Sequence, residues 1–375
     1  MTTAAMPTSG TWTLRPRALR TVIGLELRQR VRSRRWIWLL ILWGAALLGL
    51  SLLIFLGALA LSPALKGQWE ALGALAFSAD MVLLIFAMLL ILPALASGSI
   101  NGDRTAGTLA TLQATLLSAA EIVVGKILAG WLIGLMFLLA ALPAIVPAAA
   151  IMQAHPLRVM GMIAVVAALS LCITAISIGF SALTARQLGS VVLSYLGVLI
   201  TSAVLPVVYA LLTAMLVFPT TVTQYEPQTR YTGDYAHDAK TPCVKRTKTE
   251  DVPQTHLALP LLVVNPFVIV ADVSKPVDPR SSLDPGRSEG GEPVDLLRIL
   301  STGVRLLADP PTLADRVHCL PEQPGYPGEM RRSVGGPVWP WGFGAYVLSA
   351  GAATWFAVRR LRTPARSIPR GQRIA

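Results

Sequence analysis

The residues that could do chemistry gather in one polar stretch between two long apolar runs. This stretch reads NGDRTAGTLATLQATLLSAAEIVVGKILAGW, from Asn101 to Trp131. Ser118-Ala119-Ala120-Glu121 is a capping box, in which the serine hydroxyl and the glutamate carboxylate each accept a backbone N–H of the first helical turn. Asn101-Gly102 is a turn signal, and Asp103 is able to cap a helix start. These residues therefore indicate helix capping and docking on another protein.

A short helix is predicted at about residues 103–117. Leu109, Leu112 and Leu116 would share one of its faces. A neighbouring face would carry small polar side chains, those of Thr105, Thr108, Thr111 and Thr115. This surface suits docking on another protein. The alternative is an ordinary turn with a solvated face.

The sequence shows no pattern typical of covalent, metal or nucleotide chemistry. Gly125-Lys126 is followed by Ile127 and lacks the upstream glycines that cradle a phosphate. His237, His256 and His318 have no ligand-like spacing. We therefore expect no catalytic residue, no metal and no cofactor bound by this chain. Any energy for work must come from another chain.

The composition is that of a membrane protein. Hydrophobic residues make up 54% of the chain and charged residues 14%, with a mean hydropathy of +0.60; soluble chains carry about 25% charged residues. The net charge of +12 does not indicate nucleic-acid binding, because the arginines border apolar runs, where the positive-inside rule puts them in the cytoplasm. They are Arg15, Arg17, Arg20, Arg28, Arg30, Arg32, Arg34 and Arg35 at one end, and Arg359, Arg360, Arg362, Arg366, Arg370 and Arg373 at the other.

The fold expected is an all-α polytopic membrane protein with six transmembrane helices and both termini in the cytoplasm. The spans fall at about 36–61, 72–97, 122–150, 159–183, 188–217 and 341–358. Residues 1–35 are predicted to form an amphipathic interfacial helix whose apolar stripe is Leu19, Val22, Ile23, Leu27 and Val31. Residues 359–375 form a basic cytoplasmic tail.

The long segment 218–340 is predicted to lie outside the cell. Within it, 257–273 is apolar but short and interrupted by Pro260 and Pro266, so it is re-entrant, interfacial or part of a folded outer domain. Residues 294–307 are expected to form a helix whose apolar face is Leu296, Leu297, Leu300 and Val304. Cys243 and Cys319 are a possible disulfide pair in this oxidising location, or two unrelated thiols.

Small polar residues form stripes along the fourth and fifth spans. They either let the helices pack closely or line a substrate path, and the candidates are Ser170, Thr174, Ser177, Ser181, Ser194 and Thr201. Gly130 and Gly134 form a GxxxG pattern on the third span. Asp80 is placed at the outer edge of the second span, where hydration is the more common state, although a carboxylate at membrane depth is a functional candidate.

The polar stretch resembles the permease subunits of ABC-2 type exporters. The matching residues are Asp103, Arg104, Gly107, Thr108, Leu109, Leu112, Ser118, Glu121, Ile122, Gly125 and Lys126. The order of spans and the outer segment before the last one are also similar, and Asn265-Pro266-Phe267 resembles a short motif of that segment. Leu117 stands where members of the family often have proline.

The resemblance implies a transporter subunit in the cell membrane without its own ATPase site. A separate ATP-binding subunit would bind ATP and Mg, and a second permease subunit would complete the unit. The coupling helix would dock on the ATP-binding subunit through Asp103, Arg104, Thr105, Gly107, Thr108, Leu109, Leu112, Thr115 and Glu121. Substrate would move outward by alternating access. The alternative is a membrane-anchored protein whose outer segment carries an enzymatic or receptor function.

Overall fold

The computed structural model describes residues 12–31, 34–61, 68–105, 117–227, 242–274, 295–309, 316–317, 324 and 335–361. The chain divides into two compact units. The first comprises Met1–Ser202 with Phe343–Ala375, and the second comprises Ala203–Gly342.

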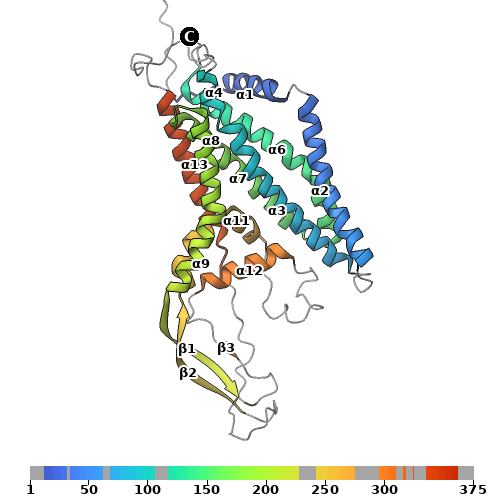
Figure 1. Cartoon of the computed structure of the whole chain (residues 1–375), viewed down its shortest axis with the longest axis vertical. Coiled ribbons are helices and arrows are strands. Elements are labelled where there is room, and N and C mark those ends of the chain that lie inside the picture. Colours follow the sequence, from blue (N-terminus) through green and yellow to red (C-terminus); the bar gives the residue numbers. More distant parts are fainter. Residues whose placement is uncertain are drawn as a thin grey trace, which may run out of the picture. The chain divides into compact units, whose positions relative to one another are not determined.

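The first unit is a bundle of long apolar helices (Figure 1). Its helices are α1 (Pro16–Val31), α2 (Arg34–Leu61), α3 (Trp69–Ala96), α4 (Ser99–Thr105), α6 (Ala119–Ile151), α7 (Pro156–Leu183), α8 (Gln187–Leu199) and most of α13 (Trp339–Leu361). The core lies where α3, α6 and α7 pack together, and it contains the fully buried side chains of Phe77, Phe137 and Met162.

Five helical segments are long and apolar enough to cross a membrane. They are Arg34–Ala60, Trp69–Thr105, Ala119–Ile151, Pro156–Leu183 and Gln187–Met215. These match the first five predicted spans, so the prediction of a predominantly helical, multi-pass membrane protein is confirmed. Helix α13, the predicted sixth span, has 23 residues, but it is not among the five. Glycines and hydroxyl residues interrupt its apolar character, and its crossing stays a prediction.

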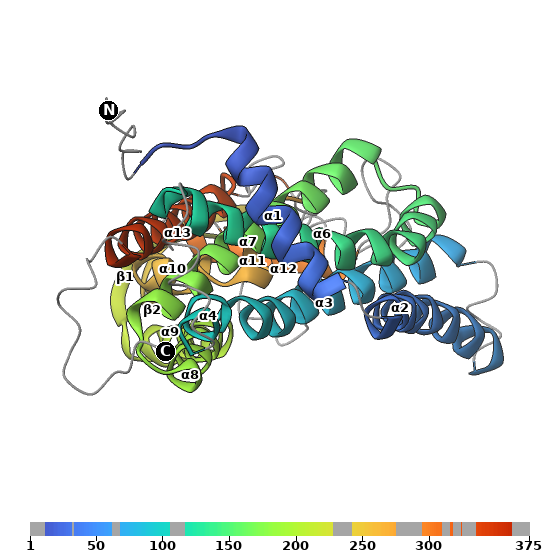
Figure 2. The same cartoon turned by 90° about the horizontal axis from the view of Figure 1, so that it is seen from above.

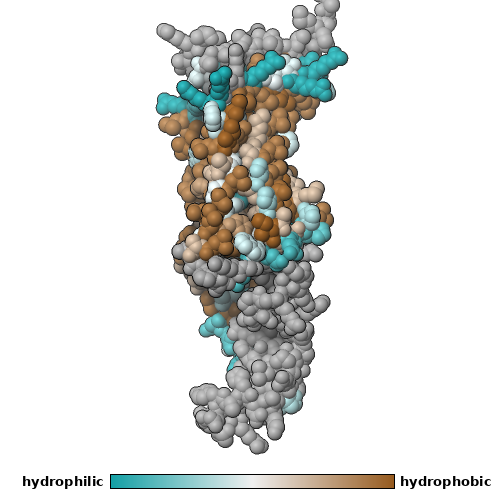
Figure 3. All heavy atoms as spheres, turned by 90° about the vertical axis from the view of Figure 1, so that its right-hand side faces the viewer, coloured by the Kyte–Doolittle hydropathy of each residue, from teal (hydrophilic) through white to brown (hydrophobic). Residues whose placement is uncertain are grey.

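Helix α2 turns most of its apolar side chains outward. Trp38, Leu42 and Leu53 are each about two-thirds exposed or more. Figure 3 shows one face of the molecule, on which apolar side chains cover the helical region and hydrophilic ones gather at one end. Large apolar patches of this kind mark a surface that meets lipid or another protein, which agrees with a membrane setting.

The fifth predicted span is one helix in three parts. Helix α8 passes through a π-helical turn, η2 (Ile200–Val204), into α9 (Leu205–Met215). Pro206 stands in the first turn of α9 and has no N–H group to donate to the preceding turn. A π-helical turn is a common way to accommodate such a break.

The second unit contains strands that the sequence analysis did not predict. Strands β1 (Val217–Pro227) and β2 (Cys243–Pro253) are antiparallel, with Val217 opposite Pro253 and Pro227 opposite Cys243. Strand β3 (Arg316–Val317) pairs in parallel with Gln224 and Tyr225, so the order is β2-β1-β3. The sequence does contain a signal for strand β1. Threonine, valine and tyrosine are enriched in strands, and they recur through Val217–Pro227.

The apolar segment at 257–273 is a pair of short helices, α10 (Thr255–Val263) and α11 (Pro266–Asp272), bent by 101°. The bend follows from the residues between them. The Asn265 side chain accepts the N–H groups of Phe267 and Val268 at 2.9 and 3.4 Å, which starts a new helix, and Pro266 occupies its first position. At 1.5 Å per residue, the helices are about 14 and 10 Å long, too short to cross a core of about 30 Å at this angle.

Helix α12 (Leu296–Ala308) confirms the predicted helix, and only part of its predicted apolar face is buried. Leu297 and Val304 are buried, whereas Leu296 is 57% exposed and Leu300 37% exposed. The buried face also includes Ser301 and Thr302. The spacing of the leucines does not show that Ser301 lies on the buried face, because its hydrogen-bond acceptor, Asp272, is in another helix.

Candidate functional site

The capping box at the start of α6 is present as predicted. The Ser118 hydroxyl accepts the Glu121 N–H at 3.0 Å, and the Glu121 carboxylate accepts the Ser118 N–H at 2.8 Å. The same hydroxyl donates to the Thr13 carbonyl at 2.6 Å, which ties the box to the segment before α1. The box is therefore also a tertiary contact.

Glu121 holds the start of α1 through Arg15. Its carboxylate accepts hydrogen bonds from the Arg15 backbone N–H at 2.8 Å and from the guanidinium Nε and Nη2 at 3.0 and 3.1 Å. The Glu121 side chain is fully buried, whereas that of Arg15 is half exposed. The hydrogen bond to Glu121 raises the pKa of the Arg15 guanidinium above its ordinary value. A charged pair thus fixes the junction between α1 and α6.

A second cluster lies one turn further along α6, and we call it the lysine cluster: Glu26, Asp103 and Lys126. Lys126 is buried and forms ion pairs with Glu26 of α1 and with Asp103 of α4, the latter at 2.7 Å. Its Nζ also donates to the Ser99 carbonyl at 3.3 Å. Gly125 leaves the room for α1, since a Cβ there would lie 2.6 Å from Val22. Helices α1, α4 and α6 therefore meet at one lysine.

Helix α1 lies across the end of the bundle, not parallel to its helices (Figures 1 and 2). The predicted N-terminal helix is confirmed, and Val22 of its apolar stripe packs on α6. Glu26, which was not predicted as a site residue, is the single acidic residue of Pro16–Val31 and lies on that stripe. An acid among apolar positions was the available signal for a buried ion pair.

The start of α4 corrects the prediction of a turn at Asn101-Gly102. Both residues lie inside the helix, which begins at Ser99, and Asp103 is not its cap. The Ser181 hydroxyl of α7 accepts the N–H groups of Ile100 and Asn101 at 3.1 and 3.2 Å. The Asn101 amide donates to the Thr184 hydroxyl at 2.9 Å and to the Arg186 carbonyl at 3.4 Å. Contacts with α7 replace the local turn.

The remaining residues predicted to couple to a partner are only partly described. Arg104 and Thr105 are exposed at the end of α4, and the Thr105 hydroxyl donates to the Gly102 carbonyl at 2.9 Å. Residues Gly107, Thr108, Leu109, Leu112 and Thr115 lie outside the described residues, as does most of the predicted helix at 103–117. Their docking role stays a prediction. The structure does bring Asp103 and Glu121 together with α1, through Lys126 and Arg15.

The hydroxyl stripes of α7 and α8 are buried between helices. Ser170, Thr174, Ser177 and Ser181 are almost fully covered, as is Ser194. Thr174 donates to the Ser170 carbonyl at 2.7 Å, and Ser194 donates to the Ser190 carbonyl at 2.8 Å. The Thr201 hydroxyl contacts that of Tyr346 at 3.2 Å. These are contacts of close packing, and a substrate path along the stripes stays a prediction.

The two glycines of the GxxxG pattern in α6 pack against other helices of the same chain. A Cβ on Gly130 would lie 2.7 Å from the Thr174 methyl group, and one on Gly134 would lie 3.0 Å from Leu92. Neighbouring helices α7 and α3 therefore take the close approach that small residues permit.

Asp80 is not at a hydrated edge, so that expectation is wrong. It lies within α3 and is fully buried, and its Oδ2 accepts a hydrogen bond from Ser51 of α2 at 2.6 Å. The sequence could not show this, because the covering comes from the packing of α2 on α3.

Cys243, at the start of β2, is disulfide-bonded, and Cys172 is free and buried. Cys319 lies outside the described residues, so the pairing of Cys243 with Cys319 stays a prediction. Among the residues that the structure describes, no group of three or more His, Cys, Asp or Glu side chains could hold a metal ion.

Comparison with known families agrees with this arrangement. No curated protein sequence matches the chain. The model of the ABC-2 family transporter proteins matches residues 20–284, a range that includes α2–α9, the sheet strands β1 and β2, and the bent pair α10–α11. The match covers well over half of the chain. This protein therefore belongs to the ABC-2 family of transporter proteins.

Proposed function

We propose that the chain is the membrane-spanning permease subunit of an ABC exporter. A separate subunit binds Mg and ATP, and its hydrolysis cycle drives alternating access and outward movement of substrate. Two permease subunits, alike or different, form the working unit in the cell membrane. The observation that carries this proposal is the family match over residues 20–284.

The lysine cluster supports the route by which force would enter the chain. Helix α4 and the segment before α6 flank the polar stretch predicted to dock on the ATP-binding subunit. Through Lys126, Asp103 of α4 is tied to Glu26 of α1. A push on α4 would therefore reach α1 and α6 at once, because a buried lysine between two carboxylates resists separation from either.

The charge distribution supports a cytoplasmic position for this end. Arg17, Arg20 and Arg28 of α1 are exposed, and Arg359 and Arg360 end α13. Exposed arginines beside apolar helices favour the cytoplasmic face and anionic lipid headgroups. Both termini would then lie in the cytoplasm, with the sheet and α10–α12 outside.

The test is co-purification with the ATP-binding protein encoded beside this chain. We expect a tag on this chain to recover both proteins from mild detergent, with ATPase activity above that of the partner alone. Leu112→Asp and Arg104→Glu should release the partner or abolish the stimulation. Arg28→Glu, at an exposed position of α1, is the matched control for a change of charge and should leave both unchanged.

Two results would count against the proposal. If no ATP-binding protein associates in any mild detergent or in nanodiscs, the permease assignment fails. If the partner binds but Leu112→Asp, Arg104→Glu and Arg28→Glu all behave as wild type, the chain is still a partner of the ATPase, but the docking site lies elsewhere.

A further inference from the structure

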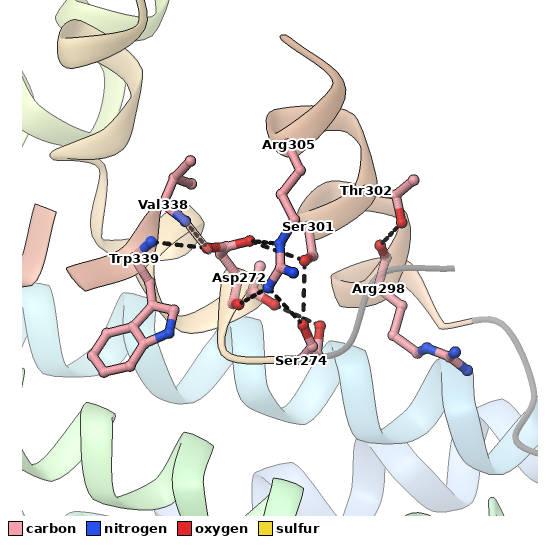
Figure 4. Close-up of polar contacts among 9 residues, drawn as sticks. Asp272, Ser274, Arg298, Ser301, Thr302, Arg305, Val338 and Trp339 are labelled. Carbon is pink, nitrogen blue, oxygen red and sulfur yellow. Dashed lines mark hydrogen bonds and ion pairs between the residues drawn. The ribbon is translucent and has the colours of Figure 1, made fainter. Parts of the chain in front are cut away.

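The second unit contains a buried polar cluster that the proposed function has not used. We call it the aspartate cluster: Asp272, Ser274, Ser301, Arg305 and the backbone N–H groups of Val338 and Trp339 (Figure 4). Asp272 ends α11 and is fully buried. Its Oδ1 accepts hydrogen bonds from Arg305 Nε at 2.6 Å and from the Ser301 hydroxyl at 3.1 Å.

The other oxygen of Asp272 caps a different helix. Its Oδ2 accepts the N–H groups of Val338 and Trp339, at 2.6 and 2.8 Å, where α13 begins. The first N–H groups of a helix have no partner within it and carry partial positive charge, so a carboxylate there is strongly favoured. Asp272 therefore has the role of an N-cap residue for α13, although it belongs to α11.

Arg305 of α12 is the cation of the aspartate cluster. Its Nη2 donates to the Asp272 carbonyl at 2.9 Å and to the Ser274 carbonyl at 3.4 Å, while its Nε bonds the Asp272 carboxylate. Helix α12 is therefore bound to both the side chain and the backbone at the end of α11. The planar guanidinium makes this possible, because its donors point in fixed directions.

A second contact joins α13 to the bent pair at the bend itself. A Cβ on Gly342 would lie 2.0 Å from the carbonyl oxygen of Val263, the last residue of α10, and 2.9 Å from the Ile269 side chain. No side chain fits there without moving the backbone. The first turn of α13 is thus fixed at the end of α10 by Gly342 and at the end of α11 by Asp272.

We propose that this arrangement is a mechanical joint, in which the start of α13 and the bent pair α10–α11 move as one body. Any displacement of α13 during the ATP cycle therefore moves the bent pair as well. As a result, the exposure of the bent pair to solvent changes during the cycle. Asp272 and Gly342 are its positioning residues. This inference rests on the proposed function.

The geometry favours a joint over a flexible link. Two contact points fix both the position and the direction of the first turn of α13, which one hydrogen bond would not do. Val263, Val268, Val304 and Val338 surround the joint with an apolar cluster. At about 1.5 Å per residue, the 23 residues of α13 extend about 34 Å. A helix of this length could carry a shift from one membrane surface to the other.

The experiment measures solvent access at α10 in the full chain with its ATP-binding partner in nanodiscs. A single reporter, Leu257→Cys, is placed where the native side chain is 57% exposed, in a Cys172→Ala background. The probe is a membrane-impermeant maleimide, applied without nucleotide and after trapping with Mg, ATP and vanadate. We expect the two labelling rates to differ by about fivefold or more, the lower end of ordinary allosteric coupling.

Gly342→Ala and Asp272→Asn should abolish this difference while partner binding and ATPase activity persist. Gly344→Ala is the matched control, since a Cβ at that position of the same helix meets nothing within 4 Å, and it should keep the difference. Arg305→Lys provides a milder break, because it keeps the charge but loses the fork of donors, and it serves if Asp272→Asn yields no monodisperse protein.

Each opposite result overturns the inference. An unchanged labelling rate in the wild type, with ATPase stimulated, means that the bent pair does not follow the cycle. A difference that survives in Gly342→Ala and Arg305→Lys means that the contacts do not transmit it. Loss in Gly344→Ala as well points to a general disturbance of α13. Failure of the partner to bind the wild-type chain is a separate outcome, and it overturns the proposed function first.

Discussion

The lysine cluster and the aspartate cluster solve the burial of charge in opposite ways. In the first, one lysine meets two carboxylates, Glu26 and Asp103. In the second, the Asp272 carboxylate has one cation, Arg305, together with one hydroxyl and two backbone N–H groups. The first therefore centres on a cation, whereas the second centres on an anion.

The two clusters also differ in exposure. The Asp103 side chain is 24% exposed, so water or a partner protein can reach it. Asp272 is fully buried, and each of its oxygens is occupied. A buried polar network with every member satisfied is rigid. We infer that α11 and the start of α13 keep a fixed relation, while Asp103 stays accessible to a docked partner and Lys126 links it to α1 and α6.

The largest effect is expected from Lys126→Met, which leaves Glu26 and Asp103 near each other without the lysine that pairs with both. Removing one partner of a buried pair costs about 3–5 kcal/mol. We expect loss of monodisperse protein or a much lower unfolding midpoint, measured by intrinsic fluorescence in detergent. Arg28→Met, at an exposed position on α1, should leave the midpoint unchanged. Normal stability of Lys126→Met would show that the lysine cluster does not hold α1 and α4.

The next effect concerns the apolar support of the aspartate cluster. Leu297 is 1% exposed on the face of α12 that carries Ser301, whereas Leu300 is 37% exposed. We expect Leu297→Ala to cost about 2–5 kcal/mol, as for other buried leucines. Leu300→Ala should cost less than about 1 kcal/mol. Thermal unfolding of both variants gives the comparison, and equal costs would mean that α12 packs through its leucine-rich face after all.

A smaller effect is expected from Arg305→Lys, which tests whether the geometry of the aspartate cluster matters beyond its charge. Lysine keeps the positive charge but loses the donors to the Asp272 and Ser274 carbonyls. Hydrogen bonds that involve a charged group contribute about 1.5–3 kcal/mol. The unfolding midpoint should fall accordingly. A midpoint equal to that of the wild type would show that a positive charge near Asp272 is sufficient without the donors of the guanidinium.

The smallest effect is expected from Asp103→Asn, although it changes a charge beside a buried lysine. Glu26 remains as the counter-ion of Lys126, and Asp103 is partly exposed, so the cost should be within about 1 kcal/mol of zero. Glu26→Gln is the matched change at the more buried acid and should cost more. If Asp103→Asn destabilises the chain more than Glu26→Gln, the two acids do not share one lysine as the structure indicates.

Local patterns made part of this structure predictable. The capping box at Ser118 and Glu121 depends on a spacing of three residues, and the spans depend on continuous apolar runs, so both could be read directly. Arg15 and Glu121 are 106 positions apart, and Glu26 and Lys126 are 100 apart. Their pairing follows from the packing of α1 on α6, which no local pattern encodes.

The differences between sequence and structure have the same origin. Asn101-Gly102 has the residues of a turn, yet both lie in α4. Ser181 of α7 accepts the N–H groups of Ile100 and Asn101, and Thr184, just after α7, accepts the Asn101 amide. In α12, no local pattern shows that Ser301 is buried while Leu300 is partly exposed, because the acceptor of Ser301 is Asp272 of α11. In each case a polar partner from a distant segment decided between local alternatives.

The hydrogen bond between Ser51 and Asp80 has a consequence for biogenesis. The Thr174 and Ser194 hydroxyls each donate to a carbonyl of their own helix, so these groups are satisfied before α7 and α8 pack on their neighbours. Asp80 differs, because its donor is on the preceding helix. An aspartate at the centre of a lone span costs about 2.5–3.5 kcal/mol on insertion. During synthesis, α2 is therefore expected to wait at the translocon until α3 emerges, so that the two enter the lipid as a hairpin.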